Sequence, residues 1–357
     1  MKIRQPPTVA GNPAAAAFTC RATPGFNASA AATVASRATR DRPATFASRA
    51  IIVVAAAFAL LATFGGTAAA APPAPEAAAP APATHTLTRR DGSLAYDDSG
   101  GSGPLVLCVP GMGDVRAQYR FLAPLLARAG FRVVTMDLRG MGASSTGWPD
   151  YSAAAVGTDM VAMIRHLGAK QAYIIGNSMA GAAAVWAAAQ DPAEVAGIVL
   201  IDPFAREMPT PMPAWQHVAL KVGMIRPWGP AFWTTYYGSL YKSSPPADLA
   251  AYRAALKANL AEPGRLEALD ATLWASKAPC EARIPEVRSP VLVVMGTKDS
   301  DFPDPVSEAN WVTSHLHGTR LMVDGAGHYP HVEYPQVVAP AIIQFMKEAR
   351  DGSRSGT

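Results

Sequence analysis

One serine of the chain stands where an apolar strand is expected to meet a helix. Ser178 lies in Gly176–Gly181 (GNSMAG), after the expected strand at 171–175 and before an Ala-rich stretch. Small residues two positions before and after it, Gly176 and Ala180, let the two backbones approach closely, so that the hydroxyl projects above a sheet edge. The helix N-terminus and the N–H of Met179 favour negative charge on a bound oxygen. The spacing predicts a nucleophilic serine.

A serine hydroxyl is a weak nucleophile and needs a base within hydrogen-bond reach. His328 is the best placed, because it follows an expected strand at 320–323 in a glycine-rich loop, and such a loop presents its side chains where ligands bind. The competitor is His331, which we interpret as a solvated residue or one that supports the site from behind. The remaining histidines fall in expected helices, the insertion or the opening hairpin: His85, His166, His217, His315 and His317.

A third residue must orient the imidazole and stabilise its charged form. We favour Asp299, which closes the strand and loop at 291–299 and is separated from His328 by one expected helix and one expected strand. Three rivals stay open at this stage. Asp301 and Asp304 lie in the same loop, where Asp304 is better suited to capping a helix. Asp202 ends the preceding strand.

The oxyanion of a reacting acyl group would need two backbone donors. Met179 supplies one. The loop Pro110–Asp114, after the apolar strand at 104–109, is expected to supply the other through the N–H of Met112, since its glycines permit close backbone approach. A second tight loop, at 137–145, follows the strand at 132–137 and is expected to shape the same edge.

These stretches together resemble the α/β-hydrolase superfamily, in its order of serine, acid and histidine, over roughly residues 84–350. The resemblance implies a mainly parallel sheet covered by helices, the triad Ser178, Asp299 and His328, and oxyanion donors at Met112 and Met179. This chain departs from many members by carrying Pro110 where they have histidine and Ala180 where they have glycine. Members that open epoxides or displace halide use an aspartate in place of the serine, so these activities are disfavoured.

The leading functional hypothesis is hydrolysis of a carboxylic ester or a related acyl bond through an acyl-serine, with a small, apolar substrate. A carbon–carbon hydrolase is the first alternative, since GNSMAG resembles the elbow of the enzymes that split ring-cleavage products. Perhydrolysis would use the same triad. A non-catalytic binding protein on the same fold is the alternative from another class.

The expected order of elements is a hairpin and then alternating strands and helices, which is typical of a parallel sheet covered on both faces. The pattern breaks at 206–288, a stretch rich in prolines and aromatics that we expect to be a helical lid between two strands. Trp215, Trp233 and Tyr237 are candidates for an apolar substrate pocket, although packing of the lid is the better explanation for most such residues individually. The predicted core is 84–205 with 289–350.

Charge excludes nucleic acid as a partner. The net charge of +4 arises from residues 1–70, which hold seven of the 31 basic residues and one of the 27 acids, so the remainder carries 24 basic and 26 acidic residues. A nucleic-acid-binding domain needs a basic face. No spacing indicates a metal site, a phosphate cradle or a dinucleotide fingerprint, and we expect no cofactor. A buried, unpaired Cys108 is favoured over a disulfide with Cys280.

Residues 1–71 have the layout of an export signal, with arginines, the apolar run Ile51–Leu61 and then small residues. We expect a periplasmic or secreted protein with a Pro/Ala-rich linker at 72–83 and a disordered tail at 351–357. About fifty residues precede the apolar run, which is long for a signal. The alternative is therefore an uncleaved membrane anchor near residues 50–64.

Overall fold

The computed structural model describes residues 83–355, and the account below concerns this range. The expected signal at 1–71 and nearly all of the linker at 72–83 lie outside the described residues. Among the described helices, none is long and apolar enough to span a bilayer.

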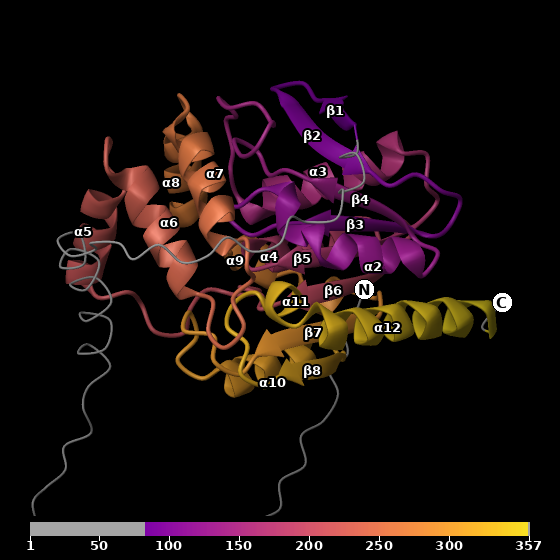
Figure 1. Cartoon of the computed structure of the whole chain (residues 1–357). Coiled ribbons are helices and arrows are strands. Elements are labelled where there is room, and N and C mark those ends of the chain that lie inside the picture. The colour runs from indigo at the N-terminus through magenta and orange to yellow at the C-terminus, as the bar shows by residue number, and fades with distance from the viewer. Residues whose placement is uncertain (1–82, 356–357) are drawn as a thin grey trace, which may run out of the picture. The chain divides into compact units, whose positions relative to one another are not determined.

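The core is a sheet with the strand order β1-β2-β4-β3-β5-β6-β7-β8 (Figure 1). Its first two strands form the predicted antiparallel hairpin, and β2 pairs antiparallel with β4. All other pairs are parallel, so the predicted α/β-hydrolase class, with its mainly parallel sheet, is confirmed. The strands are β1 Thr84–Thr88, β2 Ser93–Asp98, β3 Leu105–Val109, β4 Arg132–Met136, β5 Ala172–Asn177, β6 Val195–Ile201, β7 Val291–Gly296 and β8 Thr319–Val323.

Helices cover both faces because the central strands are apolar on both sides, as in β3, all five of whose residues are buried. Leu105, Leu107 and Val109 join the core under α3, α4 and α10, while Val106 and Cys108 join the core under α2 and α12. These helices are α2 Leu122–Arg128, α3 Ala153–His166, α4 Met179–Gln190, α10 Pro305–His315 and α12 Pro335–Ser355.

The two body cysteines belong to opposite cores. Cys108 packs among the residues under α2 and α12, and Cys280 packs on the other face of the sheet. Both are buried free thiols. The sheet between them explains why they do not pair, since a disulfide requires Cα atoms within about 7 Å.

A helical insertion separates β6 from β7, as the break in the strand–helix pattern indicates. Figure 1 shows its helices α5 to α8 gathered at one side of the sheet. Hydrogen bonds join it to the loops that follow β3, β4 and β8. Its elements are α5 Ala214–Gly223, α6 Gly229–Ser239, α7 Leu249–Ala261, α8 Arg265–Trp274, α9 Ala278–Glu281 and η3 Ile284–Glu286.

Two helices differ from their expected bounds. The helix expected at 119–130 is a 3-10 turn, η2 Arg116–Arg120, followed by the shorter α2. The last helix, expected at 337–350, begins at Pro335 and continues to Ser355, into the segment expected to be disordered. Proline suits the first turn, where its missing N–H has no intrahelical role.

Candidate active site

Ser178 stands on the strained turn between β5 and α4. Its φ of 57° and ψ of −125° lie outside the regions that side-chain-bearing residues prefer, as a nucleophile elbow requires. The close approach expected at this turn is present, because a Cβ added to Gly176 would lie 2.3 Å from the carbonyl oxygen of Ala180. The hydroxyl sits at the carboxyl end of β5, and Ser178 is 4% exposed.

His328 and Asp299 are in direct contact. The Nδ1 atom of His328 lies 2.6 Å from Oδ2 of Asp299, and both side chains are almost fully buried. Their loops follow β8 and β7 and touch: a Cβ added to Gly296 would lie 2.1 Å from the carbonyl oxygen of Gly327. Within the described chain, no direct hydrogen bond joins Ser178 to His328. Such bonds are often long in unliganded sites and tighten when substrate binds.

Asn177 connects the elbow to the histidine loop. Its Nδ2 donates to the carbonyl oxygens of Ile201 (3.0 Å) and His328 (3.2 Å), and its Oδ1 accepts from Gln118 (3.0 Å). The side chain is fully buried. This bridge holds the backbones of Ser178 and His328 in a fixed relation. The sequence shows Asn177 only as a variable position of the elbow.

The charges around His328 favour its protonated form. Burial lowers the pKa of the imidazole, but the carboxylates of Asp299 and Asp301 outweigh this and raise the pKa to about 8. Burial raises the pKa of Asp299, but the charge of His328 and its hydrogen bond outweigh it and leave the pKa below its usual value. The pair therefore stabilises the imidazolium that would form when His328 takes a proton.

The three rival acids have other roles. Asp304 caps α10 by accepting from the N–H of Ser307 at 3.0 Å, as its sequence position indicated. Asp301 is 3.7 Å from Nδ1 of His328 and accepts a hydrogen bond from Tyr236 at 2.7 Å. Asp202 is fully buried and accepts from the N–H of Gly296 at 3.0 Å.

Asp202 supports Asp299 from behind. Polar atoms of Asp202, Asp299 and His328 lie within 4.8 Å of one another. Burial and the neighbouring charge of Asp299 raise the pKa of Asp202 well above its usual value, which favours the protonated form of this carboxyl beside the Asp299 carboxylate. The three side chains could also offer ligand atoms to a cation, although the short bond between His328 and Asp299 already uses one atom of each.

The loop after β3 faces the serine. A Cβ added to Gly111 would lie 2.9 Å from Cβ of Ser178. The N–H of Met112 has no acceptor among the described residues. Met179 is the first residue of α4, where backbone N–H groups have no intrahelical partner. Both expected donors are thus available near Ser178.

Two of the three residues expected in the pocket bind this loop instead of presenting a free face. Trp233 donates to the carbonyl oxygen of Gly113 at 3.2 Å, and Tyr237 donates to Asp114 at 3.0 Å. Tyr252 donates to the same carboxylate at 2.6 Å. Trp215 lies on α5 and is 41% exposed. No sequence pattern marks Asp114 as the residue that joins α6 and α7 to the oxyanion loop, and burial raises the pKa of this carboxyl to about 6.

Glu333 fastens the histidine loop to the insertion. Its carboxylate accepts from the N–H of Gly327 at 2.7 Å, and from three successive N–H groups at residues 242–244. The N–H of His328 donates to Leu240 at 3.1 Å. His331, interpreted above as solvated or supporting, is fully buried and packs against Tyr119. Burial lowers its pKa to about 3, so it stays neutral.

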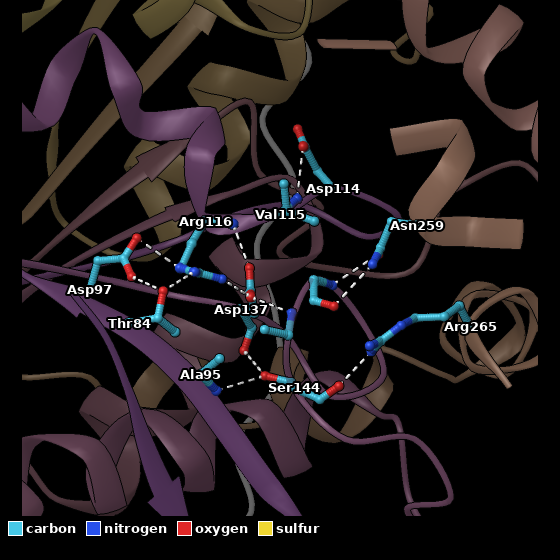
Figure 2. Close-up of polar contacts among 12 residues, drawn as sticks. Thr84, Ala95, Asp97, Asp114, Val115, Arg116, Asp137, Ser144, Asn259 and Arg265 are labelled. Carbon is cyan, nitrogen blue, oxygen red and sulfur yellow. Dashed lines mark hydrogen bonds and ion pairs between the residues drawn. The ribbon is translucent and has the colours of Figure 1, made fainter. Parts of the chain in front are cut away.

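The loop after β4 shapes the same edge, as expected. Figure 2 shows Asp137 accepting from Arg116. Asp137 also accepts from the N–H of Ala143 at 2.9 Å, which closes the loop on itself. From the insertion, Asn259 exchanges two hydrogen bonds of 3.0 Å with Gly142, and Arg265 donates to the carbonyl oxygen of Ser144. This loop thus anchors α7 and α8 over the sheet edge.

Comparison with known proteins decides the family. A model of the alpha/beta hydrolase fold family matches residues 104–335, which include the elbow, both loops and the insertion. The chain belongs to the alpha/beta hydrolase fold family. The chain is 29% identical over 268 residues to polyketide synthase ThaQ of Burkholderia thailandensis, and this match spans 72% of the chain but only 12% of the length of that synthase.

Two further matches cover most of the length of the protein with which the chain is compared. Over 217 residues the hydrolase is 28% identical to 3-oxoadipate enol-lactonase 2 of Acinetobacter baylyi, covering 60% of this chain and 78% of the lactonase. A crystal structure of a hydrolase from Pseudomonas aeruginosa superposes with a TM-score of 0.63 at 24% identity, covering 74% of this chain and 99% of the other. The latter shows the shared fold alone.

Proposed function

We propose that this hydrolase cleaves a carboxylic ester or a related acyl bond through an acyl-serine intermediate. The observation that carries the proposal is the arrangement of the elbow: Ser178 on its strained turn, with His328 held by a buried Asp299 at 2.6 Å. The likeness to an enzyme named as an enol-lactonase is consistent with a cyclic or open-chain ester as substrate.

The reaction follows from the atoms available. Asp299 holds Nδ1 of His328, so Nε2 is the ring nitrogen left to take and return a proton. Ser178 Oγ attacks the acyl carbon while Nε2 takes the hydroxyl proton, and the charge of Asp299 stabilises the imidazolium. The tetrahedral oxyanion accepts hydrogen bonds from the N–H groups of Met112 and Met179.

The intermediate then collapses and the acyl–oxygen bond breaks. The leaving alkoxide takes its proton from Nε2 of His328, which leaves the acyl group on Ser178. Water then attacks the acyl carbon and gives a proton to Nε2. That proton returns to Ser178 Oγ when the carboxylic acid leaves, so the enzyme is regenerated with no external oxidant or reductant.

The helical insertion acts as a lid in this proposal. Ser178 and His328 are 4% and 2% exposed, and the insertion contacts the loops on either side of them. A substrate must therefore displace part of the insertion to reach Ser178. Phe204 and Phe302, whose stacked rings lie 6.0 and 6.5 Å from the ring of His328, provide an apolar surface for the acyl group.

A substrate panel tests the proposal. Short-chain aryl esters, lactones and a vinylogous diketone of the ring-cleavage type are offered to the parent, to Ser178→Ala and to the surface control Ser314→Ala. Ester or lactone turnover by the parent and the control, lost in Ser178→Ala, supports it. Turnover of the diketone alone would favour carbon–carbon hydrolysis. Turnover that survives in Ser178→Ala would refute the role of the serine.

We also propose, from the sequence of residues 1–71, that the chain is exported. Cell fractionation of the tagged full-length chain tests this. Recovery in the periplasm or the medium supports a cleaved signal, whereas recovery in the membrane fraction supports the anchor at residues 50–64. Recovery in the cytosol would refute export.

A further inference from the structure

Most of the large exposed apolar side chains among the described residues lie on the helix α5 of the insertion or within five residues of its ends. Among the described residues, eight large apolar side chains are exposed, and six of them fall within residues 212–228. We call these six the α5 face, and they are between 41% and 61% exposed. The α5 face comprises Met212, Trp215, Val218, Val222, Ile225 and Trp228.

The spacing of these residues places them together. Trp215, Val218 and Val222 follow the i, i+3, i+7 pattern and share one side of α5. Trp228 is held beside them because its Nε1 donates to the carbonyl oxygen of Val222 at 2.9 Å. On its other side, α5 packs into the protein: His217 stacks on Trp274, and Gly223 contacts Phe232 of α6. In Figure 1, α5 forms the outer edge of the insertion.

One cation without an acidic partner, Lys221, lies beside the α5 face. Residues 208–228, which carry the face, include Lys221 and Arg226 but no Asp or Glu, whereas acids slightly outnumber bases in the chain beyond residue 70. Arg226 pairs with Glu267. Lys221 is exposed, lies beside Val222, and has no acidic partner among the described residues; its ammonium is 5.6 Å from the ring centroid of Trp274.

Apolar area of this kind needs a partner, because monomeric proteins seldom leave a contiguous patch of large apolar side chains in water. A second copy of the chain fits less well, since it would add a second Lys221, and Lys221 has no acidic partner among the described residues. An anionic lipid surface fits both properties. Trp rings with a polar N–H are suited to the headgroup region, and a helix with an apolar face and basic flanks lies in the plane of a membrane.

We propose that the α5 face docks on an anionic lipid surface, with Trp215, Val218 and Val222 entering the headgroup–acyl boundary and Lys221 near the lipid phosphates. This docking is distinct from the apolar run at residues 51–61, because it belongs to the folded insertion. It also does not depend on the reaction proposed at Ser178. The lipid is recognised by its charge and its apolar interior, and no specific headgroup is implied.

Vesicle binding by the full chain tests the proposal. Sedimentation is measured with phosphatidylcholine vesicles, alone and with added phosphatidylglycerol. The variants are Val218→Glu/Val222→Glu and a matched control, Val306→Glu/Val337→Glu, which alters the two exposed apolar residues that lie outside the α5 face. Every variant carries the same residues 1–82, so any binding by that segment is common to all.

We expect the full chain to bind the anionic vesicles more strongly than the neutral ones. The α5 variant should bind at least about tenfold more weakly, because two apolar side chains leave the lipid and two like charges face it. The control should bind as the parent does. Lys221→Ala should weaken binding about fivefold on anionic vesicles alone.

Quenching by brominated acyl chains reports on the α5 face itself, even if residues 1–82 also hold the chain on the vesicle. We expect tryptophan fluorescence to be quenched in the parent, and much less so in Trp215→Phe/Trp228→Phe. Equal binding by the α5 variant and its control, together with unquenched tryptophans, would overturn the proposal. The proposal would also be overturned if the chain self-associates in a concentration-dependent way and Val218→Glu/Val222→Glu abolishes this, since a second copy would then cover the α5 face.

Discussion

The Nδ1 atom of His328 lies 2.6 Å from the Oδ2 atom of Asp299, and the next carboxylate, that of Asp301, is 3.7 Å from the same nitrogen. Two acids of one loop thus stand at unequal distances from one imidazole. The shorter contact orients the ring, whereas the longer one contributes mainly charge, because 3.7 Å exceeds ordinary hydrogen-bond length.

This inequality predicts different outcomes for two matched variants. Asp299→Asn should lower kcat by about 10³–10⁴-fold, because an amide favours the wrong tautomer of His328 and cannot stabilise the imidazolium. Asp301→Asn should cost far less, about tenfold at most, as it leaves the 2.6 Å bond intact. Steady-state kinetics on the best ester of the panel measures both. Equal losses, or a larger loss in Asp301→Asn, would reassign the acid.

The pH profile follows from the pKa of His328, which the carboxylates raise to about 8. The imidazole acts as a base only when neutral, so kcat/KM should rise with pH through about 8 and then level off. Asp301→Asn removes a charge that raises this pKa, and the midpoint should move to lower pH. A midpoint that is identical in the parent and the variant would contradict this electrostatic account.

Asp202 should behave as a neutral group. Asp202→Asn retains an acceptor for the N–H of Gly296 and a donor toward Asp299, so kcat should stay within about threefold of the parent. Asp202→Ala leaves the N–H of Gly296 unpaired and should destabilise the fold by about 1–3 kcal/mol. A loss of kcat in Asp202→Asn as large as in Asp299→Asn would show that the Asp202 carboxylate is itself required.

The same residue predicts a dependence of stability on pH. Its pKa is raised in the folded state, so the folded protein holds a proton that the unfolded chain releases above its usual pKa of about 4. The proton bound to Asp202 stabilises the folded protein fully below that pH. This contribution is lost as the pH rises through the pKa that Asp202 has in the folded protein. Asp202→Asn should therefore raise Tm relative to the parent at about pH 8 more than at about pH 4. A difference in Tm that is independent of pH would contradict this.

Asp114 should hold the insertion on the oxyanion loop. Asp114→Ala removes the carboxylate that accepts from the hydroxyls of Tyr237 and Tyr252, and it should cost about 1–3 kcal/mol in all, because the Tyr237 hydroxyl keeps its 2.9 Å hydrogen bond with Tyr241. We expect faster proteolysis within α6 and α7 and a lower kcat. The control is Asp248→Ala, which breaks a partly exposed ion pair with Arg120 worth less than about 1 kcal/mol. If the two variants resist proteolysis equally, the insertion is held by contacts other than those of Asp114.

The elbow tolerates no side chain at Gly176. A Cβ there would lie 2.3 Å from the carbonyl oxygen of Ala180, and backbone cannot give way as a flexible side chain can. Gly176→Ala should lower the free energy of unfolding by about 2 kcal/mol or more and abolish activity. The control is Gly197→Ala in the neighbouring β6, where the contact is 3.2 Å to the ring of Tyr173. Chemical denaturation measures the free energy of unfolding of both variants. An equally small loss in the two would contradict the close backbone contact at Gly176.

The site residues that the sequence predicts are those marked by a pattern among their immediate neighbours in the chain. Ser178 and His328 follow apolar strands and stand among glycines, and parallel strands end at one edge of a sheet, so the order of elements alone brings them together. Asp304 carried a helix-capping pattern and does cap α10. The hairpin, the parallel sheet and the position of the insertion follow from the same alternation of elements.

The residues that sequence reasoning missed act through partners far along the chain. Asp114 meets Tyr252 across 138 residues, and Asn177 meets His328 across 151. No local pattern marks such pairs. Glu333 sits in an ordinary helical turn, and only the folded structure shows its carboxylate beneath residues 242–244. The sequence leaves Asp202 open as an alternative to Asp299, whereas in the structure Asp202 lies beside that residue.

Covalent labelling of the full chain with a fluorophosphonate probe, followed by peptide mapping, tests the central claim most directly. His328→Ala and the exposed control His315→Ala are treated alongside. The account predicts one adduct, on the peptide that carries Ser178, in the parent and in His315→Ala, and none in His328→Ala. A folded parent that takes up no probe, or one that is labelled on another serine, would contradict the assignment of Ser178 as an activated nucleophile.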